Sequence, residues 1–157
     1  MLTTISQFEN LKLKNQLCFA LYAATNAITR AYRSRLSHIG LTYSQYLVMM
    51  VLWEADGITV KNIAQQLHLD SPTITPLLKR LESAGFVNRQ RNARDERVVN
   101  IFLTDAGRNI QARVAEMQKG VACQTGMEEK QFIELRSTLH ELIDTINLNQ
   151  PDMQDAA

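Results

Sequence analysis

The chain has 157 residues, of which 45% are hydrophobic and 21% charged, which is enough apolar content for one domain with a core. No apolar run approaches the roughly 20 residues of a membrane-spanning helix. No secretory segment follows Met1 either, so we expect a cytoplasmic protein without a membrane partner. The formal net charge of +1 neither favours nor excludes nucleic acid.

The charges are distributed unevenly along the chain. Residues 79–97 contain six basic and three acidic side chains, whereas residues 128–157 contain seven acidic and two basic ones. This asymmetry predicts a basic centre that faces phosphate and an acidic C-terminal part that stays away from it.

The two cysteines, Cys18 and Cys123, lie 105 positions apart. That distance excludes the paired spacing of zinc and redox motifs, and two cysteines are too few for a disulfide scaffold. The three histidines, His38, His68 and His140, are scattered. We therefore expect neither a metal site nor a cofactor.

The first two helices are predicted from apolar spacing and caps. Residues 12–37 show helical periodicity, and Gly40 follows them. Thr42 and Gln45 have the spacing of a capping box, which opens a helix that ends near residues 56–57. The side chains expected to point inward from this helix are Tyr46, Leu47, Met50 and Val51.

The centre of the chain has the spacing of a helix-turn-helix. Thr59 caps a short helix, a break follows at residues 68–70, and Asp70 or Ser71 caps a second helix with Pro72 in its first turn. The buried stripe expected of that helix is Ile74, Leu77, Leu78 and Leu81.

Pro76 conflicts with a regular second helix because proline removes a backbone hydrogen bond. Two outcomes are open: either the helix starts nearer Thr73, or its first turn is tightened or kinked.

A hairpin and two further helices complete the pattern. Residues 86–91 and 97–103 are expected to be strands around a charged loop. Thr104 caps a helix over 105–119, residues 120–126 form a weak joint, and the last helix covers 127–148. The apolar face of this last helix comprises Phe132, Leu135, Leu139, Leu142, Ile143 and Ile146.

The helix-turn-helix and the hairpin together indicate a DNA-binding unit. Hydroxyls and cations suit phosphates and base edges in the major groove, and arginines at a hairpin tip suit the minor groove. Asp95 is expected to pair with Arg97 and hold the tip in shape. A solvated charged face is the alternative. The candidate DNA-binding residues are Ser71, Thr73, Thr75, Lys79, Arg80, Arg91, Arg94 and Arg97.

The string LDSPTITPLLKRLESAGFVNRQRNARDERVVNIFLTDAG, residues 69–107, resembles the MarR family of winged-helix regulators. Its DER at 95–97 and its LTxxG at 103–107 are specific markers of that family. NQLCFALY at 15–22 and LTYSQYLVMMVLWE at 41–54 look like the two-cysteine branch of the organic-hydroperoxide-sensing repressors (OhrR type).

This resemblance implies a mainly α fold with a small β-hairpin, a winged helix-turn-helix in a single domain over residues 1–157. Its dimerisation helices would lie in 7–40 and 105–148, its DNA-binding region in 41–104, and residues 149–157 would be a disordered tail. A homodimer of this kind is a repressor rather than an enzyme, and it binds an inverted-repeat operator in double-stranded DNA.

The resemblance also implies a redox site. Cys18 matches the thiol that an organic hydroperoxide oxidises, and Tyr32 and Tyr43 match its thiolate partners. Cys123 matches the resolving cysteine, which comes from the other subunit. Oxidation would release the repressor from DNA.

The residues themselves leave other interpretations open. A lone cysteine beside Leu17 is commonly a small buried hydrophobe, and Lys14 is the one cation a helical turn away. Tyr32 follows Cys18 by 14 residues, about 21 Å along a straight helix, so contact needs a bend or a second subunit. The alternatives are a MarR-type repressor controlled by a small aromatic or phenolic ligand, with structural cysteines, and a thiol peroxidase.

Overall fold

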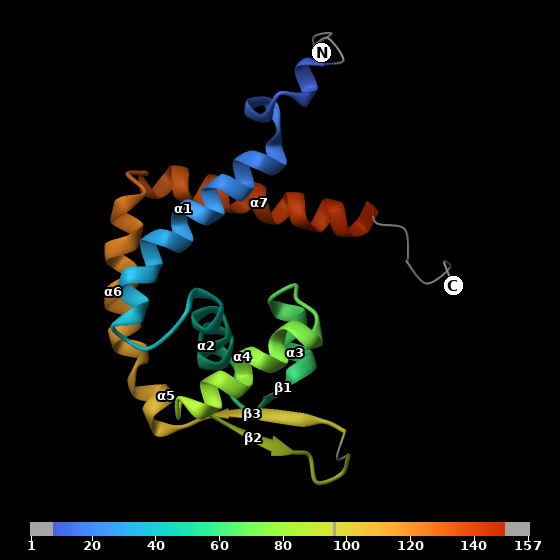
Figure 1. Ribbon diagram of the computed structural model, residues 1–157, viewed down its shortest axis with the longest axis vertical. Helices are drawn as coiled ribbons and strands as arrows, with labels where there is room; N and C mark the ends of the chain where they lie inside the picture. The colour runs from blue at the N-terminus through green and yellow to red at the C-terminus, as the bar shows by residue number, and fades with distance from the viewer. Residues whose placement is uncertain (1–7, 96, 150–157) are drawn as a thin grey trace. The chain divides into compact units, whose positions relative to one another are not determined.

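The computed structural model describes residues 8–95 and 97–149, so the tail expected after Asn149 lies outside the described residues. The chain divides into two compact units, residues 1–118 and 119–157. The first unit contains six α-helices, among them most of α6, and a three-stranded antiparallel sheet within its described residues (Figure 1). The expected fold class, mainly helical with a β-hairpin, is confirmed.

The N-terminal helix starts later than predicted. Two 3-10 turns, η1 (Glu9–Leu11) and η2 (Leu13–Asn15), precede α1 (Leu17–Ser37). Gln16 has an extended backbone, and the Asn15 amide donates to the Glu9 carbonyl at 2.8 Å. These local bonds end the 3-10 turns before α1, so the predicted start at residue 12 was wrong.

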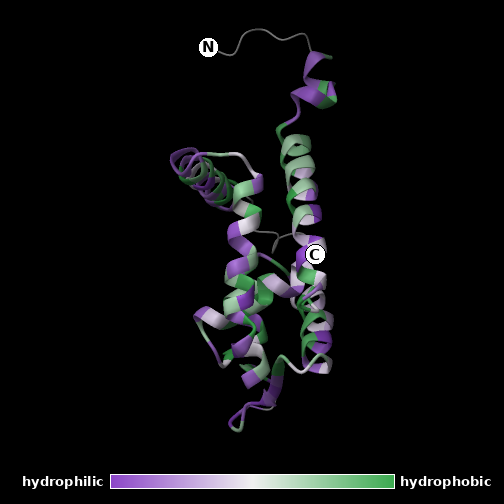
Figure 2. Cartoon of the chain, turned by 90° about the vertical axis from the view of Figure 1, so that its left-hand side faces the viewer, coloured by the Kyte–Doolittle hydropathy of each residue, from purple (hydrophilic) through white to green (hydrophobic). Residues whose placement is uncertain are grey.

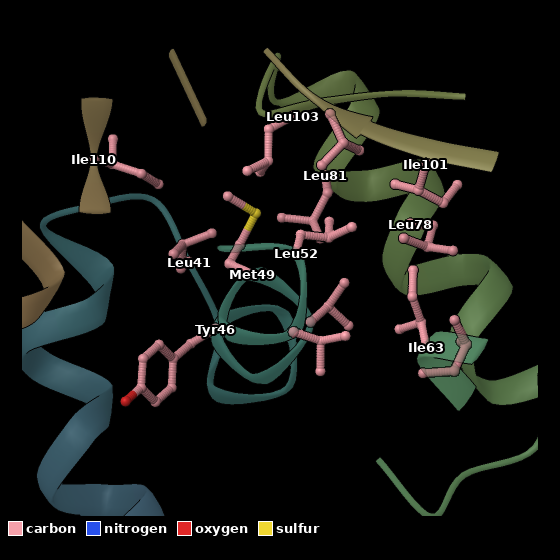
Figure 3. Packing of buried hydrophobic residues seen from close by; sticks show 14 of the residues in the cluster. Leu41, Tyr46, Met49, Leu52, Ile63, Leu78, Leu81, Ile101, Leu103 and Ile110 are labelled. Atoms are coloured by element: carbon pink, nitrogen blue, oxygen red, sulfur yellow. The ribbon is translucent and has the colours of Figure 1, made fainter. Parts of the chain in front are cut away.

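Helix α2 (Tyr43–Glu54) opens at the predicted capping box. The Thr42 N–H donates to Gln45 Oε1 at 2.8 Å, and the Gln45 N–H donates to Thr42 Oγ1 at 3.3 Å. The predicted inward set was partly wrong, because Leu47 and Met50 are half-buried whereas Val48, Met49 and Leu52 are fully buried. Contacts with α1, α3, α4 and β3 surround α2, so no single apolar stripe describes it (Figure 3).

The helix-turn-helix consists of α3 (Val60–Gln66) and α4 (Ser71–Ser83). Thr59 caps α3 by accepting from the Asn62 N–H at 3.1 Å, and Asp70 caps α4. His68 takes a left-handed backbone with φ +52° in the turn between them.

Pro76 does not displace the start of α4, which remains a helix from Ser71 through the proline. The Pro72 carbonyl is the acceptor that loses its helical donor, because Pro76 has no N–H.

Strands β2 (Val87–Arg91) and β3 (Val99–Leu103) form the predicted hairpin. A third strand, β1 (Ile58–Thr59), pairs with the other side of β3 through Ile58 opposite Ile101, so the sheet order is β1-β3-β2. The sequence analysis did not predict β1, because two residues are too few to show strand alternation.

The helix predicted over 105–119 is two helices, α5 (Asp105–Asn109) and α6 (Gln111–Gln124). Thr104 caps α5 as expected by accepting from the Gly107 N–H at 3.0 Å. Helix α6 continues past Gly120 into the second unit, so the joint is shorter than the predicted 120–126. Helix α7 (Glu129–Asn149) follows, and the apolar side chains of Phe132, Ile133, Leu135, Ile143 and Ile146 are exposed on it.

One carboxylate connects three segments of the first unit. Asp56 Oδ1 accepts from the N–H groups of Gly57 (2.9 Å) and Leu103 (2.8 Å), and Asp56 Oδ2 accepts from Arg108 Nη2 at 2.7 Å. Arg108 also donates to the Leu103 carbonyl. The turn after α2, strand β3 and helix α5 are therefore held together.

The same junction explains the glycine of the LTxxG string. Trp53 Nε1 donates to the Gly107 carbonyl at 2.9 Å, and a Cβ built on Gly107 would lie 2.1 Å from the Phe86 carbonyl oxygen. Only a residue without a side chain allows the start of α5 to approach Phe86 this closely.

We expect Asp56→Ala to lower the free energy of unfolding by about 2 kcal/mol, since it removes three hydrogen bonds to a charged but partly solvated carboxylate. Urea denaturation measures this. Glu54→Ala, at the exposed end of α2, is the matched control. Equal urea midpoints for the two variants would contradict the role given to Asp56.

Candidate nucleic-acid interface and thiol site

Helix α4 has one buried and one exposed face. Ile74, Leu78 and Leu81 are fully buried and seat the helix on the core, and the predicted fourth member, Leu77, is half-buried. Ser71, Thr73, Lys79 and Arg80 are exposed, whereas Thr75 is half-buried.

The first turn of α4 is ordered by its cap. Asp70 Oδ1 accepts from the Thr73 N–H at 2.9 Å, and this bonding with Thr73 lowers the pKa of the Asp70 carboxyl. The Thr75 hydroxyl donates to the Ser71 carbonyl at 2.8 Å. Ser71 and Thr73 are exposed, and the Thr73 side chain is also hydrogen-bonded to Asp70.

The hairpin tip, residues 92–98, is shaped by main-chain bonds. The Asn92 N–H donates to the Val98 carbonyl, and the Val98 N–H donates to the Asp95 carbonyl. Asp95 Oδ1 accepts from the Arg97 N–H at 3.0 Å. The pairing expected between Asp95 and Arg97 is thus made through the backbone of Arg97.

The side chains of Arg91, Arg94 and Arg97 are exposed on the hairpin. Figure 2 shows the hairpin tip as a hydrophilic projection. The recognition-helix candidates and the three arginines lie in the same compact unit, on the two elements that a winged helix-turn-helix presents to DNA.

Three tyrosines form a cluster between α1 and α2. The ring centroid of Tyr32 lies 5.3 Å from that of Tyr43 and 5.4 Å from that of Tyr46, and Tyr43 and Tyr46 are 5.9 Å apart. The sequence analysis named Tyr32 and Tyr43 and treated Tyr46 as packing. The one sequence pattern that could have predicted that Tyr46 joins the cluster is its helical spacing from Tyr43.

The Tyr43 and Tyr46 hydroxyls of this cluster remain protonated at neutral pH. Burial raises the pKa of Tyr43, and Tyr32 raises it further; burial and then Tyr32 raise the pKa of Tyr46 strongly. Protonated phenols are hydrogen-bond donors, which suits them to stabilise an anion.

Tyr43 also lines an open hollow of about 610 Å³ between α1 and α2. Thr25, Thr29 and Arg33 line it from α1, and Leu47 lines it from α2. The hollow therefore combines hydroxyls, one cation and apolar surface.

Cys18 lies in the first turn of α1 and is exposed, so it is not the buried hydrophobe of the alternative interpretation. Its apolar neighbours are exposed as well: Leu17 is 59% and Tyr22 66% accessible. Lys14 lies in η2, outside α1, and so is not one helical turn from the thiol. Since α1 is one helix, Tyr32 lies about 21 Å from Cys18 along it, and the two do not meet within one chain.

Cys123 lies in the last turn of α6, in the second unit, and is exposed. With Thr125, Met127, Glu129 and Phe132 it lines a hollow of about 290 Å³. The structure therefore places Cys123 in a helix rather than in the predicted joint.

Two absences concern the described residues alone. Within residues 8–95 and 97–149, no three His, Cys, Asp or Glu side chains are grouped as a metal ion would require. No helix in the same part of the chain has the length and apolarity to cross a membrane.

The fold defines the class of the protein, a winged-helix transcriptional regulator. The sequence pattern of the transcriptional regulators SarA/Rot matches residues 30–114. The regulator TtmR of Methylorubrum extorquens is 56% identical over 115 residues, which cover 73% of this chain and 59% of TtmR, less than two thirds of its length. The organic hydroperoxide resistance transcriptional regulator of Bacillus subtilis is 40% identical, with 90% of this chain and 97% of that protein covered.

Solved structures agree with this. Reduced AbfR bound to DNA has a TM-score of 0.77 and 36% identity, covering 91% of this chain and 97% of AbfR; AbfR, a protein of Staphylococcus epidermidis, has also been solved with a disulfide formed. A MarR transcriptional regulator of Methanosarcina mazei shares the fold at 20% identity and a TM-score of 0.73, covering 83% and 96% of the two chains. The chain belongs to the SarA/Rot family of winged-helix transcriptional regulators, and its predicted resemblance to MarR-type regulators is confirmed.

We expect the stability of the folded protein to fall as pH rises above about 10, the ordinary tyrosine pKa. The folded-state pKa values of Tyr43 and Tyr46 are raised, so the unfolded chain ionises first and gains stability relative to the folded one. The measurement is the denaturation midpoint at several pH values from about 9 to about 11, a range that brackets the ordinary tyrosine pKa. Tyr46→Phe should flatten the decline, with Tyr22→Phe, at an exposed ring, as the matched control. An equal decline in all three proteins would contradict the assignment.

Proposed function

We propose that this protein is a cytoplasmic, homodimeric repressor that binds an inverted-repeat operator in double-stranded DNA and senses organic hydroperoxides through Cys18. The observation that carries the proposal is the separation, along α1, of the exposed Cys18 thiol from the tyrosine cluster that Tyr32 joins. Each half of such a site is incomplete in one chain, and a second copy supplies the other half.

Exposed apolar side chains support dimerisation. Leu17, Phe19 and Tyr22 are exposed at the start of α1, which Figure 2 colours largely hydrophobic. In the second unit, α7 exposes its own apolar face. Apolar patches of this kind commonly mark protein interfaces, and we assign residues 7–40 and 105–148 to the dimer.

The DNA-binding role rests on α4 and the hairpin. Ser71, Thr73, Thr75, Lys79 and Arg80 face the major groove, and Arg91, Arg94 and Arg97 serve the adjacent minor groove and its phosphates. Asp95 orders the tip. The DNA complex of AbfR, 36% identical to this chain, supports this role.

The redox step begins at the Cys18 thiolate, which the hydroxyls of the partner's Tyr32 and Tyr43 stabilise by donating hydrogen bonds. The sulfur attacks one oxygen of ROOH, the O–O bond breaks, and the alkoxide leaves as ROH after taking a proton. Cys18 is thereby oxidised to sulfenic acid.

The second cysteine then converts the sulfenic acid to a disulfide. The thiol of the partner's Cys123 attacks the sulfenic sulfur, the S–O bond breaks, and water leaves as the disulfide forms. A disulfide requires Cα atoms within about 7 Å, so closing it moves helices and changes the spacing of the two recognition helices. The disulfide-formed structure of AbfR supports this step.

A second candidate function is control by a small aromatic or phenolic ligand, with both cysteines structural. The hollow of about 610 Å³ that Tyr43 and Arg33 line favours it, since a cation and a phenol suit such a ligand. A thiol peroxidase is less well supported, because turnover needs a reductant to regenerate the thiols.

We expect an organic hydroperoxide to weaken DNA binding of the wild type at least about tenfold, a coupling of about 1.4 kcal/mol, and to leave Cys18→Ser unaffected. Electrophoretic mobility shifts before and after peroxide measure this. Cys123→Ser is the matched variant: it should form the sulfenic acid at Cys18, but neither the intersubunit disulfide in non-reducing mass spectrometry nor the full loss of DNA binding. Release of Cys18→Ser by peroxide would sink the thiol mechanism.

Subunit mixing tests the shared site. Mixed dimers combine one Cys18→Ser chain with one Tyr32→Phe, Tyr43→Phe chain. If the tyrosines act in trans, one of the two sites is intact, because the Cys18 of the second chain meets the tyrosines of the first, and the other site lacks both halves. The response to peroxide then returns in the mixed dimer. No gain over either parent would show that the site lies within one chain.

For the DNA interface, we expect Arg80→Ala with Arg94→Ala to weaken binding and to reduce the slope of log K against log salt by about 2, roughly 0.9 for each lost phosphate contact. Lys130→Ala, on α7, is the control. Binding to a mixed-sequence duplex by fluorescence anisotropy at several salt concentrations gives the slope, and an unchanged slope would contradict the placement.

A further inference from the structure

A basic hollow of about 490 Å³ lies where α3, α4 and the hairpin meet. Of its lining residues that the structure describes, Lys61, Arg89 and Arg97 are cationic and none is acidic. Ser71 and Thr75 add hydroxyls from the first turns of α4. Three cations, one from α3 and two from the hairpin, therefore line one space.

Arg89 is the cation with unused bonding capacity. Its backbone N–H donates to Glu82 Oε1 at 3.1 Å, but its Nη1 lies 3.9 Å from Glu82 Oε2, too far for a hydrogen bond. Its Nε is buried and has no hydrogen-bond partner among the described residues. The side chain is 26% exposed and forms a 3.9 Å ion pair with Glu82, which leaves the buried Nε without a partner in the described part of the chain.

The other two cations are positioned by the fold. Lys61 is the second residue of α3 and is exposed, directly after the Thr59 cap. Arg97 precedes β3, and the bond from its N–H to Asp95 fixes its main chain. Arg97 was a DNA-binding candidate from the sequence, whereas Lys61 and Arg89 were not, because a lysine on a short helix and an arginine in a strand each resemble ordinary surface residues.

We propose that this hollow seats a phosphate group, bound by Lys61 and Arg89 together with Arg97. A planar guanidinium with free N–H donors matches the oxygens of phosphate, and an ammonium adds a point charge. The phosphate belongs to the DNA backbone, so the proposal rests on the DNA-binding function proposed above. A free phosphate compound has the same chemistry and is the other source.

The position of the hollow supports the backbone as the source. It lies between the recognition helix and the hairpin. When α4 enters the major groove of a duplex and the hairpin enters the adjacent minor groove, the sugar-phosphate strand between the two grooves passes over this hollow. Phosphate contacts set register and orientation, so Lys61 and Arg89 fix how α4 enters the groove.

The experiment compares Lys61→Gln and Arg89→Gln with wild type on a mixed-sequence duplex, by fluorescence anisotropy over a range of salt. Each variant should weaken binding and reduce the slope of log K against log salt by about 0.9. Lys130→Gln removes the same charge outside the hollow and should leave the slope unchanged. Thermal denaturation checks folding, and Lys61→Gln, at an exposed position, serves if Arg89→Gln is unstable.

The second arm uses pyrophosphate on the DNA-free protein, with chloride at matched ionic strength as reference. If the duplex slope falls in the variants and pyrophosphate leaves the wild-type Tm unchanged, the phosphate is that of the DNA backbone. If pyrophosphate raises the wild-type Tm but not that of the variants, while duplex binding is unaffected, the site takes a free phosphate compound and the DNA source is overturned.

If the variants keep the wild-type slope of log K against log salt, and pyrophosphate does not change the Tm of the wild type, the phosphate site itself is overturned. In that case wild type still binds the duplex, so the proposed DNA-binding function stands. Failure of the wild type to bind the duplex at all would instead remove the proposed function and the backbone source with it.

Discussion

The carboxylate of Asp56 holds together three segments of the first unit. It bonds the turn after α2, the last residue of β3 and the guanidinium of Arg108 in α5, segments about 50 positions apart in the chain. Helix α5 leads directly into α6, and α6 carries the chain toward Cys123. The sheet and α5 therefore share an anchor.

Elements with local signals could be predicted from the sequence. Thr42, Thr59, Asp70 and Thr104 cap helices through bonds that span three residues, and such bonds need no knowledge of the rest of the fold. Strand β1 could not be predicted, since it exists only because β3 lies beside it. The inward residues of α2 were misjudged for a related reason: the helix is surrounded, and periodicity assumes one buried side.

The candidate sites divide in the same way. Local periodicity predicts which side chains of α4 and of the hairpin are exposed, so the DNA-binding candidates could be named from the sequence. Tyr46, Lys61 and Arg89 were missed because their significance depends on neighbours from other elements. The separation of Cys18 from Tyr32, in contrast, could be predicted, because helical rise alone shows that the two side chains do not meet within one straight helix.

The hairpin tip has a consequence for how such a regulator diversifies. Its shape depends on main-chain bonds and on the side chains of Asn92 and Asp95, whereas the guanidinium groups of Arg91 and Arg94 are exposed. Under the proposed function, substituting these arginines alters what the tip reads without unfolding it. Operator preference can therefore drift over evolutionary time on an unchanged scaffold, and duplicated copies can acquire separate sets of genes while keeping one sensing chemistry.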